Sequence, residues 1–142
     1  MSKQSRKRIV VIEDNAPDVF LLEEALVQAN VDCELLSLVD GEQARTYLLN
    51  CAGEAAPDLL LVDLNLPKLN GSELLELIRR QASLARVPVV VWSSFSDKRL
   101  IGQFGVKHFF TKPCSLDAFV EIGEVIRGIL ADDAALTAAA GK

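Results

Sequence analysis

The run Asp58-Leu59-Leu60-Leu61-Val62-Asp63 decides how this chain folds. Four consecutive apolar residues between two aspartates are too few for a buried helix and are typical of a short strand covered on both faces. The run from Val87 to Trp92 has the same character, and Pro88 lies near its start, where a missing N–H is tolerated. Because strands buried on both faces occur in parallel sheets, these two runs predict the centre of a parallel sheet.

Shorter runs on either side complete the pattern. Brief β-branched or leucine-rich segments predict three more strands, at Arg8 to Ile12, roughly Cys33 to Val39, and Lys107 to Phe110. Amphipathic stretches between the strands and after the last one predict helices over Ala16 to Asn30, Gly41 to Leu49, Gly71 to Gln81 and Ser115 to Leu130. Strands that alternate with helices form right-handed βαβ units, so the sequence predicts a doubly wound α/β domain of three layers.

Length and composition indicate one domain. The 142 residues are 50% hydrophobic and 25% charged, with a mean hydropathy of +0.24, which suits a chain with a sizeable core. The net charge of -5 disfavours a nucleic-acid partner, which needs a basic face. We expect a basic leader over residues 1–7, the domain over 8–131, and an alanine-rich tail over 132–142. The tail either extends the last helix or frays, and fraying is favoured because free termini usually fray.

The cysteines and the apolar runs bear on where the protein works. Cys33, Cys51 and Cys114 have neither CxxC nor Cys/His spacing, so we expect reduced thiols in a reducing compartment. The apolar run Ile9 to Ile12 is too short for a signal peptide, and no run approaches the roughly 20 residues of a membrane span. The sequence therefore predicts a cytoplasmic protein without a membrane partner.

Polar residues follow four of the predicted strands. The first strand is followed by Glu13 and Asp14, the third ends in Asp63, the fourth is followed by Ser93, and the fifth by Lys112. Ligands of open parallel sheets bind beyond the carboxyl ends of the strands, so these side chains are expected to converge. Clustered carboxylates suit a hard cation such as Mg²⁺, and a lysine and a hydroxyl can neutralise phosphoryl oxygens. Asp63 is then the natural nucleophile, forming an acyl phosphate.

Four separated motifs make the chain recognisable, because together they resemble the receiver domain of bacterial two-component response regulators. The motifs are Val11-Ile12-Glu13-Asp14-Asn15, Leu60-Leu61-Val62-Asp63-Leu64-Asn65-Leu66-Pro67 with Gly71, Pro88-Val89-Val90-Val91-Trp92-Ser93-Ser94, and Thr111-Lys112-Pro113. The resemblance runs from about Arg8 to Leu130. It implies a (βα)5, flavodoxin-like sandwich with strand order 2-1-3-4-5, and a signalling switch rather than an enzyme.

The resemblance also implies a role for each site residue. Asp63 resembles the phospho-acceptor and Lys112 the lysine that contacts the phosphoryl group. The Mg²⁺ ligands would be Glu13, Asp14, Asp63 and the backbone carbonyl of Asn65. Ser93 and Phe109 resemble the switch pair, whose hydroxyl and ring move on phosphorylation. A switch of this kind receives its phosphoryl group from a sensor histidine kinase or a phosphotransfer protein.

The segment Glu13 to Asp18, and the lack of an attached output domain, resemble the stand-alone regulators that serve bacterial phytochrome-type histidine kinases. Whether the molecule is a monomer or a homodimer is left open. The stretch between Ser93 and Lys112 is shorter than is usual in the family, so the fourth helix, within Phe95 to Phe104, should be short or irregular. Phe95 is expected to hinder the attacking water and slow hydrolysis of the acyl phosphate.

Other protein classes fit the sequence less well. A flavodoxin-like electron carrier needs a Ser/Thr/Gly phosphate loop after the first strand, where this chain has acids. A phosphohydrolase with an aspartate nucleophile needs an Asp-x-Asp motif at the end of the first strand and a cap segment, which are not found. A receiver fold that has lost phosphorylation is disfavoured because each expected chemical group is present. Singly, Ser93 could satisfy a backbone group, and Phe109 and Trp92 could be core residues.

Overall fold

The computed structural model describes residues 6–51, 56–67, 69–94 and 98–140, with side chains to residue 131. Five parallel strands form one sheet in the order β2-β1-β3-β6-β7. Their bounds are β1 Lys7–Ile12, β2 Cys33–Leu38, β3 Leu59–Val62, β6 Val89–Ser93 and β7 His108–Thr111. The predicted order 2-1-3-4-5 is therefore confirmed, because β6 and β7 are the fourth and fifth strands of the sheet.

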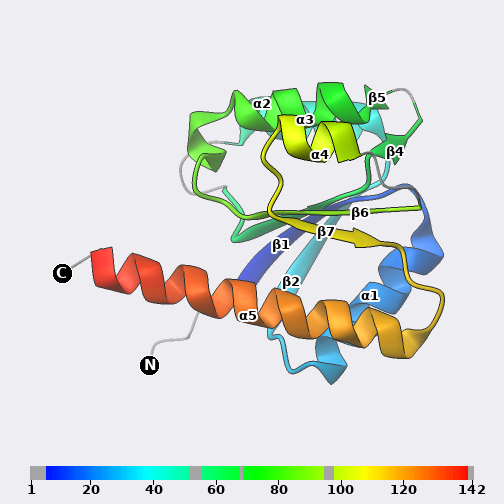
Figure 1. The fold of residues 1–142 in the computed structure, drawn as a ribbon, viewed down its shortest axis with the longest axis vertical. Helices are drawn as coiled ribbons and strands as arrows, with labels where there is room; N and C mark the ends of the chain where they lie inside the picture. Colours follow the sequence, from blue (N-terminus) through cyan, green and yellow to red (C-terminus); the bar gives the residue numbers. More distant parts are fainter. Residues whose placement is uncertain (1–5, 52–55, 68, 95–97, 141–142) are drawn as a thin grey trace.

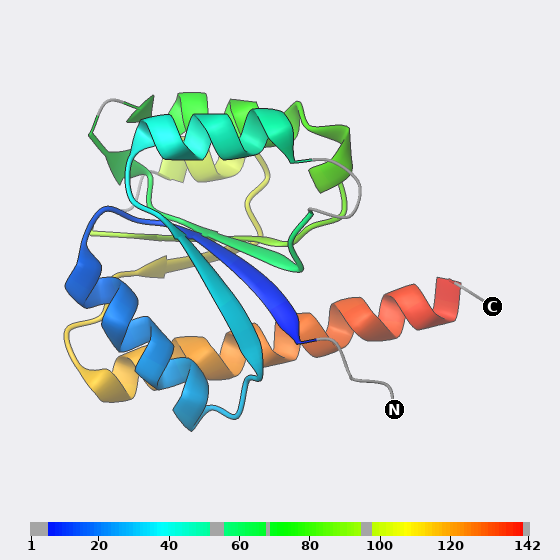
Figure 2. The same cartoon turned by 180° about the vertical axis from the view of Figure 1, so that it is seen from behind.

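Helices cover both faces of this sheet (Figure 1). On one face lie α2, α3 and α4, and on the other lie α1 and α5, as the reverse view also shows (Figure 2). The bounds are α1 Ala16–Gln28, α2 Gly41–Asn50, α3 Gly71–Arg79, α4 Lys98–Gln103 and α5 Leu116–Ala140. A 3-10 turn, Ala82–Leu84, follows α3. The three-layer sandwich expected from the sequence is confirmed.

The two halves of the core follow the alternation of side chains along the strands. Val10 and Ile12 of β1 pack toward α2 and α3, whereas Ile9 and Val11 pack toward α1 and α5. All four side chains are fully buried. Since the sheet is buried on both faces, its central strands can be apolar throughout, which is why the sequence shows continuous runs there.

On the α1–α5 face, Trp92 of β6 packs edge-on against Phe119 of α5, with ring centroids 5.8 Å apart and planes at 87°. The expectation that Trp92 packs against a helix is confirmed. Close contact between the two helices depends on Gly123 of α5, because a Cβ there would lie 3.0 Å from the carbonyl oxygen of Ala25 and 3.2 Å from the Cβ of Ala29.

Helix starts are fixed by local hydrogen bonds. Asn70 and Glu73 form a capping box at the start of α3, and the Ser115 hydroxyl accepts from the Ala118 N–H at the start of α5. The short α4 has six residues and no buried side chain, as the shortened segment predicted. Phe95 lies outside the described residues, so the expectation about hydrolysis stays a prediction.

Two features differ from the expectations. A small antiparallel hairpin, β4 Asn65–Leu66 with β5 Leu69–Asn70, lies between β3 and α3. The last helix continues to Ala140 instead of fraying from residue 132, since alanine has the highest helix propensity. This part of α5 extends past the edge of the sheet (Figures 1 and 2). Within the described ranges, no helix has the length and apolar character needed to cross a bilayer.

Candidate functional site

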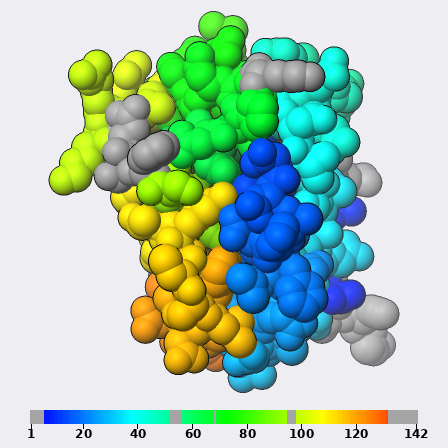
Figure 3. All heavy atoms as spheres, turned by 90° about the vertical axis from the view of Figure 1, so that its right-hand side faces the viewer, coloured from blue at the N-terminus to red at the C-terminus, as the bar shows by residue number. Residues whose placement is uncertain are grey.

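The candidate site lies at the carboxyl ends of the strands, the face shown in Figure 3. On that face the blue segment after β1, the green segment after β3 and the gold segment before α5 meet. The ladders continue one residue past the strands, because the Asp63 N–H donates to the Ile12 carbonyl at 3.0 Å and the Lys112 N–H donates to the Ser93 carbonyl at 2.8 Å. The backbone thus sets the predicted site residues side by side.

Glu13, Asp14 and Asp63 form a group of carboxylates whose nearest oxygens all lie within 4.8 Å of one another. Glu13 and Asp63 are buried and Asp14 is exposed. Two short turns orient the buried pair, since Glu13 Oε2 accepts from the Asn15 N–H at 3.0 Å and Asp63 Oδ1 accepts from the Asn65 N–H at 2.9 Å. The acid group predicted from the strand ends is present in the fold.

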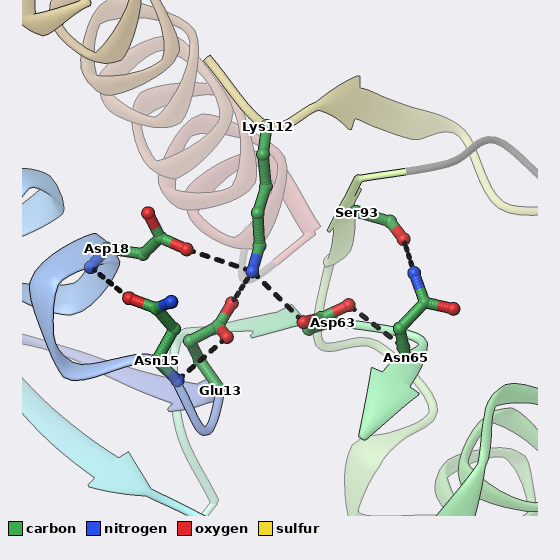
Figure 4. A network of polar contacts seen from close by, with 7 residues as sticks. All are labelled: Glu13, Asn15, Asp18, Asp63, Asn65, Ser93 and Lys112. Carbon is green, nitrogen blue, oxygen red and sulfur yellow. Dashed lines mark hydrogen bonds and ion pairs between the residues drawn. The ribbon is translucent and has the colours of Figure 1, made fainter. Parts of the chain in front are cut away.

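Lys112 reaches into this group from the loop between β7 and α5 (Figure 4). Its Nζ lies 2.8 Å from Glu13 Oε1, 3.0 Å from Asp18 Oδ2 and 3.1 Å from Asp63 Oδ2. The lysine side chain is only 13% exposed, so these ion pairs are poorly screened by solvent. Nζ also lies 5.7 Å from the centroid of the Trp92 ring, a cation–π distance.

Two side chains of the site have raised pKa values, for different physical reasons. Burial raises the pKa of Glu13 to about 7, and the charge of Asp63 adds to this rise while the contact with Lys112 opposes it. Burial by itself would lower the pKa of Lys112, but its contacts with Glu13 and Asp18, and the charge of Asp63, raise it well above its usual value. The lysine is therefore firmly charged, whereas Glu13 titrates near neutrality in the metal-free protein.

The donor set fits a hard divalent cation. The three grouped side chains offer only carboxylate oxygens, which are the ligands that Mg²⁺ and Mn²⁺ prefer. Glu13 Oε1 is fully buried and has no well-directed hydrogen bond within the described part of the chain, although Nζ of Lys112 lies near it. A buried carboxylate oxygen without such a partner is costly unless a cation engages it.

The predicted switch residues lie near this group but are less directly connected. The Ser93 side chain is buried, and its Oγ accepts from Nδ2 of Asn65 at 2.5 Å. Asn65 had been predicted to contribute only its backbone carbonyl, so this side-chain contact is an addition. Phe109 of β7 is half-buried and packs against the core beneath α2 and α3. Its role as a switch stays a prediction.

Sequence reasoning missed Asp18, the third carboxylate on Lys112. It lies in the first turn of α1 rather than at a strand end, so the rule that located the other acids does not apply to it. The available signal was the Asn15 cap, since the Asn15 side chain accepts from the Asp18 N–H at 3.1 Å and fixes this turn. That signal alone does not identify the lysine as the partner.

Known proteins resemble this chain in sequence and in fold. Residues 9–124 match the model of the response regulator receiver domain. This chain belongs to the receiver domain family. Receiver domains are signalling modules rather than enzymes, so the resemblance stated from the motifs is confirmed at the level of the family.

Several relatives of this receiver domain are informative. The response regulator Rcp1 of Synechocystis sp. is 41% identical over 97 residues, which cover 64% of this chain and 65% of Rcp1, less than two thirds of that protein. The polar-differentiation response regulator DivK of Brucella anthropi is 30% identical over 118 residues, 81% of this chain and 91% of DivK.

Among solved structures, the phosphorylated cyanobacterial phytochrome response regulator RcpA superposes with a TM-score of 0.75 at 34% identity, covering 89% of this chain and 95% of RcpA. The Mn²⁺-bound form of Rcp1 superposes with a TM-score of 0.70 at 33% identity, covering 84% of this chain and 91% of that structure. The relatives thus include one phosphorylated protein and one that binds a divalent metal.

Proposed function

We propose that this receiver domain accepts a phosphoryl group on Asp63, from a sensor histidine kinase or a phosphotransfer protein, in a reaction that requires a divalent cation such as Mg²⁺. The observation that carries the proposal is the position of the Asp63 carboxylate, which lies 3.1 Å from Lys112 Nζ and within 4.8 Å of Glu13 and Asp14. The cation would be held by these three carboxylates and the backbone carbonyl of Asn65.

The chain's own groups prepare Asp63 for nucleophilic attack. The Asn65 N–H holds Oδ1, and Lys112 faces Oδ2. An oxygen of Asp63 forms the new P–O bond as the P–N bond of a phosphohistidine breaks, and the imidazole keeps the electron pair of that bond. Lys112 places its positive charge where the phosphoryl oxygens arrive. A divalent cation, when bound, adds charge neutralisation on the same oxygens.

The response to phosphorylation would pass through Ser93 and Phe109. In the present arrangement the Ser93 hydroxyl is held by the Asn65 amide. A phosphoryl group on Asp63 adds strong hydrogen-bond acceptors close by, so the hydroxyl would leave Asn65 and turn toward them. Phe109, on the neighbouring strand, would then change rotamer. This pair would convert chemistry at the sheet edge into a change of surface.

For the partner, we propose a phytochrome-type histidine kinase. The support is the similarity to Rcp1 and to the phytochrome response regulator RcpA, together with the Glu13 to Asp18 segment. A cytoplasmic location goes with such a kinase. A homodimer is an alternative state that size-exclusion chromatography with light scattering would detect.

The experiment is phosphorylation by a small phosphoryl donor such as acetyl phosphate. We expect Mg²⁺-dependent addition of one phosphoryl group by intact-mass spectrometry, its removal by hydroxylamine, and no addition in Asp63→Asn. The only tryptophan, Trp92, should report Mg²⁺ and beryllofluoride binding by fluorescence, since it packs beneath Lys112. Modification of Asp63→Asn, or modification of the wild type in excess EDTA, would overturn the proposal.

A further inference from the structure

Asp18 has a role that the acid group itself does not explain. We propose that Asp18 is a positioning residue, which holds the Lys112 ammonium at the rim of the site and within reach of Asp63 while Glu13 and Asp63 are engaged with a divalent cation. This inference rests on the function proposed above. Its starting observation is the ion pair of 3.0 Å between Asp18 Oδ2 and Lys112 Nζ.

Three anions compete for the Lys112 ammonium. A lysine ammonium has three N–H donors and no acceptor. In this structure three carboxylates surround it, Glu13 at 2.8 Å, Asp18 at 3.0 Å and Asp63 at 3.1 Å. Figure 4 shows the lysine reaching down between Asp18 on one side and Asp63 on the other. The ammonium is thus surrounded by anions, so any new acceptor must share it or replace one of these partners.

The three partners of Lys112 are not equivalent. Glu13 and Asp63 are also members of the metal-binding group, whereas Asp18 is not. A carboxylate that engages a divalent cation has less negative charge to offer the lysine, and the cation and the ammonium repel each other. Asp18 alone keeps its full attraction for Lys112 in that state, so it decides whether the ammonium stays near Asp63.

Asp18 is well placed to hold a negative charge. Its N–H is bound by the Asn15 side chain at the start of α1, which fixes the turn that carries it. The Asp18 side chain is 22% exposed and that of Lys112 is 13% exposed, so solvent only partly screens the pair. The N-terminal turn of a helix also favours a negative charge. Asp18 is therefore a fixed anion rather than a mobile surface acid.

Without Asp18, the anionic partners left to Lys112 among the described residues would be Glu13 and Asp63. It would then compete more strongly with a divalent cation for those two side chains. We expect Asp18→Asn to weaken Mg²⁺ binding by roughly fivefold, near the low end of the coupling seen between contacting residues, although Asp18 is not a ligand. At saturating Mg²⁺ the affinity for beryllofluoride should fall as well, because the lysine is no longer held near Asp63.

The test is a double-mutant cycle that combines Asp18→Asn with Lys112→Met. The affinity for Mg²⁺ of each variant is measured by titration calorimetry. If Asp18 acts through the lysine, Asp18→Asn weakens Mg²⁺ binding in the wild type and has little effect in the Lys112→Met background. An equal loss in both backgrounds would overturn the inference, because it would reduce Asp18 to one more negative charge near the site. Glu24→Gln, which removes an exposed acid from the same helix, is the matched control and should change the affinity little.

Two further measurements make the result decisive. Asp18→Glu keeps the charge and should restore most of the affinity for Mg²⁺ and beryllofluoride, which a merely structural defect in α1 would not allow. If Asp63→Asn binds Mg²⁺ and beryllofluoride as the wild type does, the proposed function fails. If Asp63→Asn abolishes the beryllofluoride response while the cycle is additive, only the role of Asp18 fails.

Discussion

Replacing Asp14 by asparagine should have opposite effects on stability with and without a divalent cation. Asp14 is the exposed member of the acid group, and the substitution keeps its size while removing its charge. In the metal-free protein this charge repels Glu13 and Asp63. With a cation bound, the same charge is a ligand. The order of stability between wild type and Asp14→Asn should therefore reverse when Mg²⁺ is added.

The magnitude follows from the geometry. The carboxylate oxygens lie within 4.8 Å of one another, and two unit charges at about this separation repel by roughly 1 kcal/mol in a water-like medium. Asp14 faces two such neighbours, and salt screens part of the repulsion at an exposed site. We expect Asp14→Asn to raise the free energy of unfolding by about 1 kcal/mol in EDTA. Mg²⁺ at a hundred times its dissociation constant should stabilise the wild type by about 2.7 kcal/mol and the variant far less.

The assay is urea unfolding monitored by Trp92 fluorescence, at low ionic strength and about one pH unit above the pKa of Glu13, so that Glu13 is charged. Trp92 is fully buried, so its emission reports global unfolding. Glu24→Gln serves as the control for removing an acid from a chain of net charge -5. The reasoning is refuted if Asp14→Asn in EDTA is no more stable than the wild type, or if the gain equals that of the control.

Two other substitutions test the metal-free site and the core. Burial raises the pKa of Glu13 from 4.5 to about 7, so between these pH values the folded state binds more protons than the unfolded state. The stability that Glu13 contributes is therefore complete below pH 4.5 and is lost as the pH rises through 7. Urea unfolding in EDTA should show this decline in the wild type, and Glu13→Gln should lack it; parallel pH profiles would contradict the assignment. Phe119 is 1% exposed and packs on Trp92, so Phe119→Ala should lower the free energy of unfolding by about 3–5 kcal/mol and shift the Trp92 emission, whereas Leu116→Ala, at a site 37% exposed, should cost much less. Similar losses in both variants would show that the ring pair does not anchor α5 to the sheet.

The main sheet was predictable because its chemistry is visible in short windows of sequence. Runs such as Leu59 to Val62 are apolar throughout, which occurs where both faces of a strand are covered, and the observed strand ends lie within two residues of the expected ones. The hairpin of Asn65–Leu66 with Leu69–Asn70 was not predictable, since a strand of two residues shows no alternation. The length of α5 was misjudged because the tendency of termini to fray was weighted above the helix propensity of alanine.

Some residues of the candidate site could likewise be predicted from the sequence, and others could not. Glu13, Asp14, Asp63 and Lys112 could be located because each follows a strand, and parallel strands end at one edge. Asp18 could not, because its partner lies 94 positions along the chain and depends on where the β7–α5 loop places a flexible side chain. The hydrogen bond between the Asn65 and Ser93 side chains could not be predicted either, because it also joins side chains far apart in the sequence. Backbone topology positions residues, but side-chain pairing depends on distances that only the folded chain defines.

The balance of charge at this edge gives a physical reason why phosphorylation and cation binding should be coupled. Four carboxylates, those of Glu13, Asp14, Asp18 and Asp63, face one ammonium, that of Lys112, which leaves three excess negative charges when all the acids are ionised. A phosphoryl group replaces the single charge of Asp63 with roughly 1.5 to 2 charges, so the excess grows. Lys112 cannot offset this increase, because its single positive charge is already shared among three carboxylates. If the proposed function holds, a divalent cation is therefore needed to stabilise the phosphorylated protein as well as to form it. Withdrawing Mg²⁺ from the phosphorylated protein should then lower the free energy of unfolding more than withdrawing it from the unphosphorylated protein.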